Sequence, residues 1–238
     1  MRLPNRSPRL RLAAICGAAV AAFVACDGGG GSVPPADPSC GRDAIIEDAE
    51  NGDSQIVVVE GRGGYVYAFG DDQGTTIEPG KDNFTPGWPG AHKSRSALRV
   101  KGKLAEPSGG DIYAGVGFSM TDPVSPYDAS KYKGVSFLAK VGEGSTTALR
   151  FKIPDVNTEP KGGVCKECYN DFGIDFAATT EWTRYTVMFT DLKQGDGWGD
   201  PNPAGLDASK IFGMQWQTDA VGKDYDIWID DVSFVGCD

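Results

Sequence analysis

Short apolar or alternating runs recur along the chain from residue 55 to residue 234, separated by clusters of Gly, Pro, Asp and Asn. No segment between them keeps a helical period for more than one or two turns, although residues 128–133 and 207–211 are expected to form short helical turns. The predicted strands are residues 55–60, 65–69, 97–102, 113–120, 134–141, 147–153, 184–190, 211–217 and 225–234. Strands without intervening helices predict an all-β fold, an antiparallel β-sandwich or jelly roll.

Two of these runs divide cleanly into an apolar and a polar face. Side chains alternate along a strand, so the apolar residues of 147–153 and of 211–217 each line one face. The opposite face carries Arg150, Lys152, Gln215 and Gln217. We expect Trp216 to lie in the core, while the polar face either contacts a ligand or is simply solvated.

The last run, YDIWIDDVSF at residues 225–234, carries two adjacent carboxylates. Strict alternation would place Asp231 on the face of Ile229 and Asp230 on the face of Trp228, so at least one acid is expected to point inward. An uncompensated buried carboxylate costs several kcal/mol. The run therefore requires a partner cation, a set of hydrogen-bond donors or a local bulge.

The first 25 residues have the layout of an export signal. Four Arg residues precede an apolar run over residues 12–25, which is short for a membrane span. The following Cys and Gly-rich stretch resemble a bacterial lipoprotein signal, which predicts lipidation at Cys26; ordinary secretion and an uncleaved anchor are the alternatives. We expect residues 26–39 to be a flexible linker, residues 40–238 to be one domain, and the protein to be membrane-anchored at the bacterial cell envelope or secreted.

The charge balance is acidic, with 23 basic and 33 acidic residues and a formal net charge of −10. Removal of residues 1–25 would delete four Arg and no acid, and would change that charge to −14. Binding to phosphate backbones requires a basic surface, so nucleic acid is not an expected partner. Neutral glycans and metal cations remain compatible with this charge.

Four cysteines fall within the predicted domain, which for an exported protein indicates disulfides. Of the three possible connectivities we predict Cys40 with Cys237, which would join the two ends of the domain, and Cys165 with Cys168, which would close a tight loop. A zinc site with four thiolate ligands is the alternative, and an oxidising compartment argues against it.

The residue inventory argues against most catalytic machinery. The chain has one histidine, His92, in a Gly- and Pro-rich stretch without a nucleophile motif beside it. Phosphate-loop and dinucleotide-binding patterns are not found, because the glycines of residues 61–70 lead into a strand. Carboxylates are numerous, but their spacing singles out no glycosidase pair. We therefore expect a protein that is not an enzyme.

Five segments in order resemble the galactose-binding-like jelly-roll domains, and in particular carbohydrate-binding domains akin to the family 11 modules. They are residues 45–53, 61–72, 127–140, 180–199 and 225–234. This resemblance implies a structural calcium ion between the first and last strands, with Glu50 and either Asp230 or Asp231 among its ligands. The alternative is that Asp231 accepts hydrogen bonds from backbone amides or pairs with Lys or Arg.

Glycan recognition on such a domain rests on aromatic rings that stack against sugar rings, with polar side chains that bind the hydroxyl groups. The candidate residues are Tyr65, Tyr67, Trp88, Arg150, Trp198, Gln215 and Gln217. The function expected from the sequence is non-catalytic polysaccharide binding by a lipid-anchored, calcium-stabilised domain. A structural or protein-interaction lipoprotein on the same fold and a small polysaccharide hydrolase are the alternatives.

Overall fold

The computed structural model describes residues 36–81, 84–87, 89–107 and 109–237. The chain divides into residues 1–31 and residues 32–238, and the predicted signal peptide and Cys26 lie outside the described residues. Within the described residues, no helix has the length and apolar character needed to cross a membrane.

The regular elements of the described residues are strands and single turns of 3-10 helix. The strands are β1 (Ile45–Glu47), β2 (Val66–Gly70), β3 (Leu98–Lys103), β4 (Ala114–Ser119), β5 (Gly134–Val141), β6 (Ala148–Ile153), β7 (Phe172–Ala177), β8 (Thr183–Met188), β9 (Gly213–Thr218) and β10 (Asp224–Val235). The 3-10 turns are η1 (Pro38–Cys40), η2 (Arg42–Ala44), η3 (Pro160–Gly162), η4 (Phe189–Asp191) and η5 (Ala208–Lys210).

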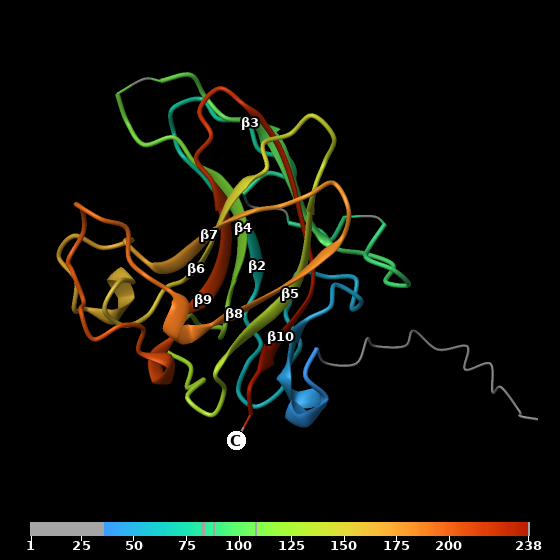
Figure 1. Cartoon of the computed structure of the whole chain (residues 1–238), viewed down its shortest axis with the longest axis vertical. Helices are drawn as coiled ribbons and strands as arrows, with labels where there is room; N and C mark the ends of the chain where they lie inside the picture. The colour runs from blue at the N-terminus through green and yellow to red at the C-terminus, as the bar shows by residue number, and fades with distance from the viewer. Residues whose placement is uncertain (1–35, 82–83, 88, 108, 238) are drawn as a thin grey trace, which may run out of the picture. The chain divides into compact units, whose positions relative to one another are not determined.

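The strands form two antiparallel sheets, which we call sheet 1 and sheet 2 (Figure 1). Sheet 1 has the order β1-β10-β5-β8, and β3 pairs with β10 as well. Sheet 2 has the order β2-β4-β9-β6-β7. The chain is thus an all-β sandwich of the jelly-roll type, as the spacing of the apolar runs predicts.

The predicted run at residues 55–60 is not a strand. Only Gln55 makes an isolated bridge, to Tyr65, and Val57 donates one backbone hydrogen bond to Ile46. The side chain of Val58 is left exposed. An apolar run becomes a strand only where a neighbour supplies a ladder of hydrogen bonds, and this segment has no such neighbour. Conversely, β1 and β7 form although neither was among the predicted runs.

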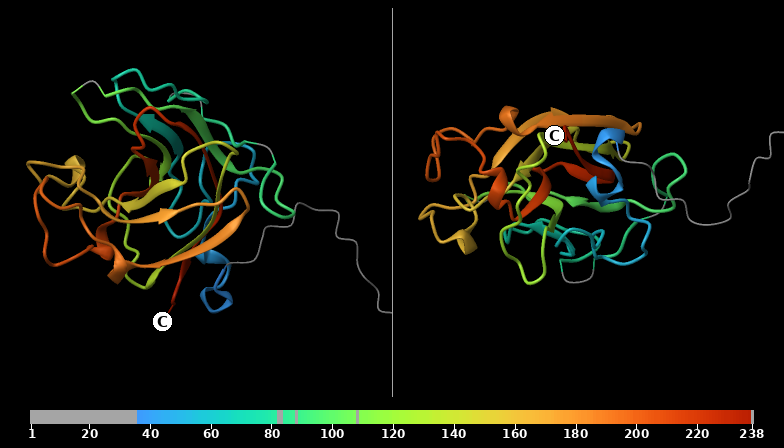
Figure 2. Two further views of the ribbon diagram at one scale, coloured as in Figure 1. Left: turned by 45° about the horizontal axis from the view of Figure 1, so that its top comes forward. Right: turned by 90° about the horizontal axis from the view of Figure 1, so that it is seen from below.

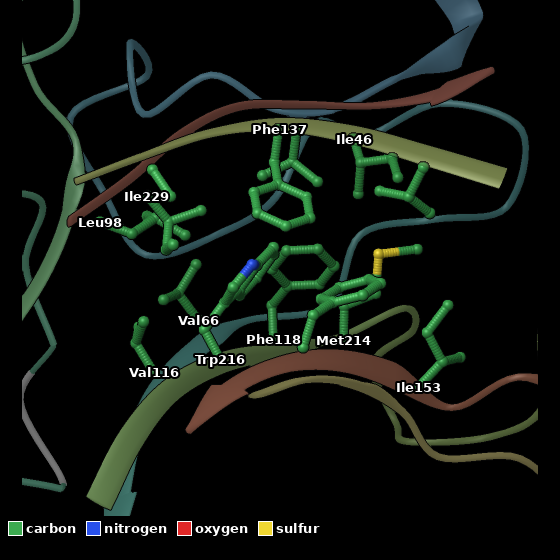
Figure 3. Packing of buried hydrophobic residues seen from close by; sticks show 14 of the residues in the cluster. Ile46, Val66, Leu98, Val116, Phe118, Phe137, Ile153, Met214, Trp216 and Ile229 are labelled. Carbon is green, nitrogen blue, oxygen red and sulfur yellow. The ribbon is translucent and has the colours of Figure 1, made fainter. Parts of the chain in front are cut away.

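The core lies between the two sheets, and the alternation seen in the sequence decides what enters it. Figure 3 shows Phe137 and Ile229 of sheet 1 facing Phe118 and Trp216 of sheet 2. The indole of Trp216 is fully buried and lies 5.2 Å, between ring centroids, from the phenyl ring of Phe137. Burial of aromatic side chains in such edge-on and tilted contacts is a major part of what holds the sheets together. The core position predicted for Trp216 is confirmed.

β10 contains a bulge at the two acids. Ile227 and Ile229 face the core, and the next core residue is Val232, so two residues instead of one separate the second core position from the third. The pairing of β10 with β5 shifts register between Asp230 and Ser233, and the φ of Asp231 is +47°. Both acids are buried, and the local bulge is one of the three solutions that the sequence pattern requires. Strict alternation does not hold here, because the extra residue takes both acids out of it.

Both predicted disulfides are present. Cys40 and Cys237 are joined with a Cα–Cα distance of 5.1 Å, beside the antiparallel pairing of β1 with β10. Cys165 and Cys168 are joined with a Cα–Cα distance of 5.2 Å. Disulfides of this kind are typical of proteins from an oxidising, exported environment.

Candidate functional site

The outer face of sheet 2 carries a continuous set of aromatic and polar side chains, which we call the platform. Its residues alternate with core residues along each strand, and the strand registers align them in two rows across the sheet. One row is Tyr67, Gly117, Gln215, Lys152 and Gly173, and the other is Phe69, Gly115, Gln217, Arg150 and Asp175.

Two glycines let the aromatic side chains of β2 lie along the sheet. A Cβ atom placed on Gly115 would stand 2.6 Å from the ring of Phe69, which shows how closely this ring approaches the backbone of β4. Tyr67 reaches past Gly117, and its hydroxyl accepts a hydrogen bond of 3.0 Å from Nε2 of Gln215. A ring that lies along a glycine strand has one face packed and leaves the other available for a ligand.

The aromatic strip continues along the sheet. The ring centroids of Tyr67 and Phe69 are 6.1 Å apart, and those of Phe69 and Tyr113 are 6.3 Å apart. Tyr65, just before β2, is 44% exposed. The ring of Tyr67 is partly exposed, whereas its hydroxyl lies deep enough that burial raises the pKa of Tyr67 to about 12. The strip can stack against apolar ring faces, and the Tyr67 hydroxyl stays protonated.

The cationic side chains of the platform are already paired with acids. Arg150 donates to Asp175 at 2.9 Å and to the carbonyl of Lys193 at 2.7 Å. The ammonium of Lys152 lies 3.2 Å from Oδ2 of Asp171, and both side chains are almost fully buried. These pairs hold the polar side chains in place and leave the platform without an unpaired cation among its described residues.

The loop of residues 154–171 brings further acids to the platform. Burial raises the pKa of Asp171, and its Oδ1 atom is buried without a hydrogen-bond partner among the described residues. Burial also raises the pKa of Glu159, and the charges of both acids act on the hydroxyl of Tyr67. The platform therefore offers acceptor oxygens and a local negative charge.

The structure brings most of the predicted ligand-contact residues together. Those on the face of sheet 2 are Tyr65, Tyr67, Arg150, Gln215 and Gln217. Trp198 is 54% exposed in the loop between η4 and η5, beyond the edge strand β7. Trp88 lies outside the described residues.

The two acids of β10 lie on the outer side of sheet 1 with few positive partners. Oδ2 of Asp230 accepts a hydrogen bond of 2.8 Å from the amide of Ala91, and Oδ1 accepts one of 2.8 Å from the amide of Asp231. Burial raises the pKa of Asp230 to about 7. Asp231 contacts the guanidinium of Arg184 at 3.4 Å, so the bulge, the hydrogen-bond donors and a cation all contribute to holding these acids.

Glu47 of β1 joins this group, and the sequence analysis missed it. It is 1% exposed; Oε1 accepts a hydrogen bond from the amide of Ala49, while Oε2 has no partner among the described residues. Burial, with the charges of Asp48 and Asp230 as smaller contributions, raises the pKa of Glu47 to about 8. The signal was available, because Glu47 follows two isoleucines directly at the start of the domain.

Glu50, the predicted calcium ligand of this region, is fully engaged with the loop of residues 94–96. Its carboxylate pairs with Arg95 at 2.9 Å and accepts hydrogen bonds from the amides of Arg95 and Ser96. Among the described residues, no three or more His, Cys, Asp or Glu side chains come together in an arrangement that could hold a metal ion. A calcium ion beside β10 would therefore depend on backbone carbonyls for much of its oxygen shell.

A hollow of about 200 Å³ lies elsewhere, at the β3 edge of sheet 1. Its walls include Glu78, Arg99 and Lys101. None of the predicted ligand-contact residues that the structure describes lines this hollow, so the platform is the better candidate site.

Comparison with solved structures identifies the architecture. A family 11 carbohydrate-binding module of a cellulosomal cellulase of Clostridium thermocellum superposes with a TM-score of 0.54 at 16% identity, over 81% of this chain and 94% of that chain. The fold of the present chain is thus that of the jelly-roll carbohydrate-binding modules. A family 11 module in complex with a β-1,3-1,4-mixed-linked tetrasaccharide, also from C. thermocellum, gives a TM-score of 0.53 at 17% identity, over 78% and 96% of the chains.

A family 30 carbohydrate-binding module gives a TM-score of 0.55 at 14% identity, over 82% of this chain and 88% of that chain. No protein-family profile matches the sequence, and no curated protein is significantly similar to it. At this level of identity the likeness to the jelly-roll modules establishes the fold, and the site has to be argued from this chain's own residues.

The centre of the platform was not predicted from the sequence. Phe69, Gly115 and Gly117 were not singled out, although the alternating glycines of residues 114–119 are visible in the sequence. Alternating glycines in a strand indicate close approach of other groups to one face. That face could not be connected with Tyr67 and Phe69 without the pairing of β2 with β4.

Proposed function

We propose that this chain binds a neutral polysaccharide on the platform and does not catalyse a reaction on it. The observation that carries the proposal is the aromatic strip of Tyr67 and Phe69 beside Gln215 and Gln217. The ring of Phe69 packs closely on Gly115, and the hydroxyl of Tyr67 accepts a hydrogen bond from Gln215. Flat rings with amide side chains beside them suit sugars, which present apolar ring faces and a rim of hydroxyl groups.

The charge of the platform supports a neutral ligand. Both cations of the platform are paired with acids, Arg150 with Asp175 and Lys152 with Asp171, and Glu159 is a further acid whose charge acts on Tyr67. An acidic polysaccharide would meet this charge without an available cation. The chain as a whole carries a formal charge of −10, which opposes the approach of polyanions further.

The test is affinity electrophoresis of the full chain, purified in detergent, through gels that contain mixed-linkage β-glucan, hydroxyethyl cellulose, xylan or galactan. We expect at least one polymer to retard the wild type and the variants Tyr67→Ala and Phe69→Ala to abolish that retardation. Trp182 directly precedes β8 of sheet 1, and its ring centroid lies 6.4 Å from that of Trp228. Trp182→Ala is the matched aromatic control and should migrate as the wild type does. If no polymer retards the wild type, the interaction-protein alternative becomes the better one; release of reducing sugar would instead favour the hydrolase alternative.

We also propose that a calcium ion stabilises the acids beside the bulge of β10. The support is limited to two buried oxygens without a partner among the described residues, Oε2 of Glu47 and Oδ1 of Asp231. Because no three acids of the described residues come together in a metal-holding arrangement, backbone carbonyls would have to supply most of the oxygen shell. Calcium would supply the positive charge that these oxygens lack. Glu50 would act by ordering the loop of residues 94–96 over the site.

We propose further that the chain is attached to a membrane through a lipid on Cys26. The support is the sequence pattern around residues 1–26, together with two disulfides that suit an exported protein. Wild-type chain expressed in a bacterium should partition into the detergent phase on cloud-point extraction, and Cys26→Ser should move it to the aqueous phase. An unchanged distribution would exclude the anchor.

A further inference from the structure

Two loops beside the edge strand β7 present large aromatic side chains to solvent. Tyr169 is 63% exposed and Trp198 is 54% exposed. Figures 1 and 2 show the loops of residues 154–171 and 192–206 side by side next to sheet 2. Single exposed apolar side chains are common in proteins, so the way in which these two are held decides whether they matter.

Trp198 is held at the tip of a specifically shaped turn. It lies between Gly197 and Gly199, whose φ angles of +81° and +69° are unfavourable for other residues. The side-chain amide of Asn170 donates hydrogen bonds from Nδ2 to the backbone carbonyls of Trp198, at 2.6 Å, and of Gly195, at 2.8 Å. A Cβ atom on Gly199 would stand 2.5 Å from Cβ of Asn170, so the turn closes tightly on this buried asparagine. The backbone around the exposed indole is therefore ordered.

Tyr169 adopts a strained backbone conformation on the other loop. Its φ is +75°, and its amide donates a hydrogen bond of 2.8 Å to the carbonyl of Thr158. The disulfide between Cys165 and Cys168 closes the segment immediately before it. A non-glycine residue in this conformation costs about 1 kcal/mol or more and is over-represented at functional sites.

Both loops are continuous with the platform. Asn170, which holds the turn of Trp198, directly precedes Asp171, the partner of Lys152. The carbonyl of Lys193 accepts a hydrogen bond of 2.7 Å from Arg150, and its amide donates one of 2.9 Å to the carbonyl of Gly173. A ligand that crosses the strands from β2 toward β7 would therefore reach the two exposed rings next.

We propose that Tyr169 and Trp198 form a second contact for the same polysaccharide chain, beyond the edge of sheet 2. This inference rests on the proposed function of the platform. The ligand then lies across the strands, and a long chain binds more tightly than a short one because only the long chain spans the platform and the loops. The disulfide between Cys165 and Cys168 helps to fix the second contact.

The experiment compares polymer with oligosaccharide. The probes are the four polymers named above and, for the polymer that retards the wild type, its tetrasaccharide, measured by calorimetry on the full chain. We expect Tyr169→Ala and Trp198→Ala each to weaken polymer binding about three- to tenfold, as expected for loss of one aromatic stacking contact, with little change for the tetrasaccharide. Tyr169→Phe should retain wild-type affinity. The double variant Cys165→Ser and Cys168→Ser should weaken polymer binding by a smaller factor.

The controls separate the failure of this inference from the failure of the proposed function. Val164→Ala changes an exposed apolar side chain of the same loop and should leave binding unchanged. Suppose that Tyr67→Ala loses polymer binding, whereas Tyr169→Ala and Trp198→Ala bind the polymer as tightly as Val164→Ala does. The second contact is then excluded, and the proposal that the platform binds polysaccharide is retained. If no polymer binds the wild type, both proposals fall together. Thermal melts of every variant identify any loss that comes from unfolding.

Discussion

Each sheet of the sandwich carries buried carboxylates, and the two sets are compensated differently. On sheet 2, Asp171 has the ammonium of Lys152 at 3.2 Å as its partner. On sheet 1, Glu47 and Asp230 accept hydrogen bonds from backbone amides but have no salt bridge among the described residues. The pKa values of Glu47 and Asp230 rise to about 8 and about 7 as a result of burial.

The difference shows that burial alone does not tell what role an acid has in the structure. That role depends on which group compensates its charge. A built-in cation makes an acid part of a permanent scaffold, as in the platform. Backbone amides alone leave a carboxylate that favours a proton or an added cation at neutral pH.

Lys152→Met should cause the largest loss, about 3 to 5 kcal/mol of unfolding free energy, because it leaves Asp171 buried without its cation. The double variant Lys152→Met and Asp171→Leu should recover most of that loss. Arg150→Met is the matched control, since Asp175 is largely exposed, and should cost about 1 kcal/mol or less. Urea unfolding measures the loss of unfolding free energy in each variant. Equal losses in Lys152→Met and Arg150→Met would contradict the claim that the buried pair contributes more than the exposed pair.

In chelator, stability should fall as pH rises. Glu47 and Asp230 keep their protons to higher pH in the folded chain than in the unfolded chain, so folding takes up protons between about pH 4 and about pH 8. The unfolding free energy should therefore decrease steadily as the pH rises across that window. Millimolar calcium should flatten the profile, as should the double variant Glu47→Gln and Asp230→Asn in chelator. If the unfolding free energy of the wild type in chelator does not fall as the pH rises, then other groups compensate the burial of these two carboxylates.

Asp231→Val should destabilise the chain by about 2 kcal/mol, because a β-branched residue is strained at the φ of +47° found in the bulge. Asp231→Gly accepts that φ and loses only the 3.4 Å contact with Arg184, so it should cost less. Thermal melts of the two variants would separate the contribution of the backbone from that of the charge. A greater loss for the glycine variant would mean that the ion pair matters more than the bulge.

Gly115→Ala should have the smallest effect on stability, about 1 to 2 kcal/mol, with a larger effect on the platform. The new methyl group would stand 2.6 Å from the ring of Phe69 and closer still to the carbonyl of Trp216, so strand and ring must both move. Polysaccharide binding should weaken together with a change in the near-ultraviolet circular dichroism of the aromatic strip. Gly74→Ala, in an open loop with a φ of +109°, provides a control for backbone strain without a clash.

The sequence alone determined the fold class and the core face of the alternating strands, and it limited the four cysteines of the domain to three connectivities, of which the predicted one is present. The fold class and the core face follow from local periodicity, and the structure confirms the predicted burial of Trp216. It also confirms the predicted disulfide between Cys40 and Cys237. The polar face of sheet 2 was partly predictable for the same reason, because parity identifies which side of a strand Gln215 and Gln217 occupy.

Which side chains from distant parts of the chain come into contact depends on the tertiary structure. The register of β2 against β4 placed Phe69 on Gly115, and the bulge in β10 took Asp230 and Asp231 out of the alternation that the sequence pattern implies. Glu50 is bound by the loop of residues 94–96, whereas Glu47 on β1 lies close enough to Asp230 to feel its charge. Registers, bulges and loop contacts depend on partners far away in the chain, and period-2 patterning within one strand carries no information about them.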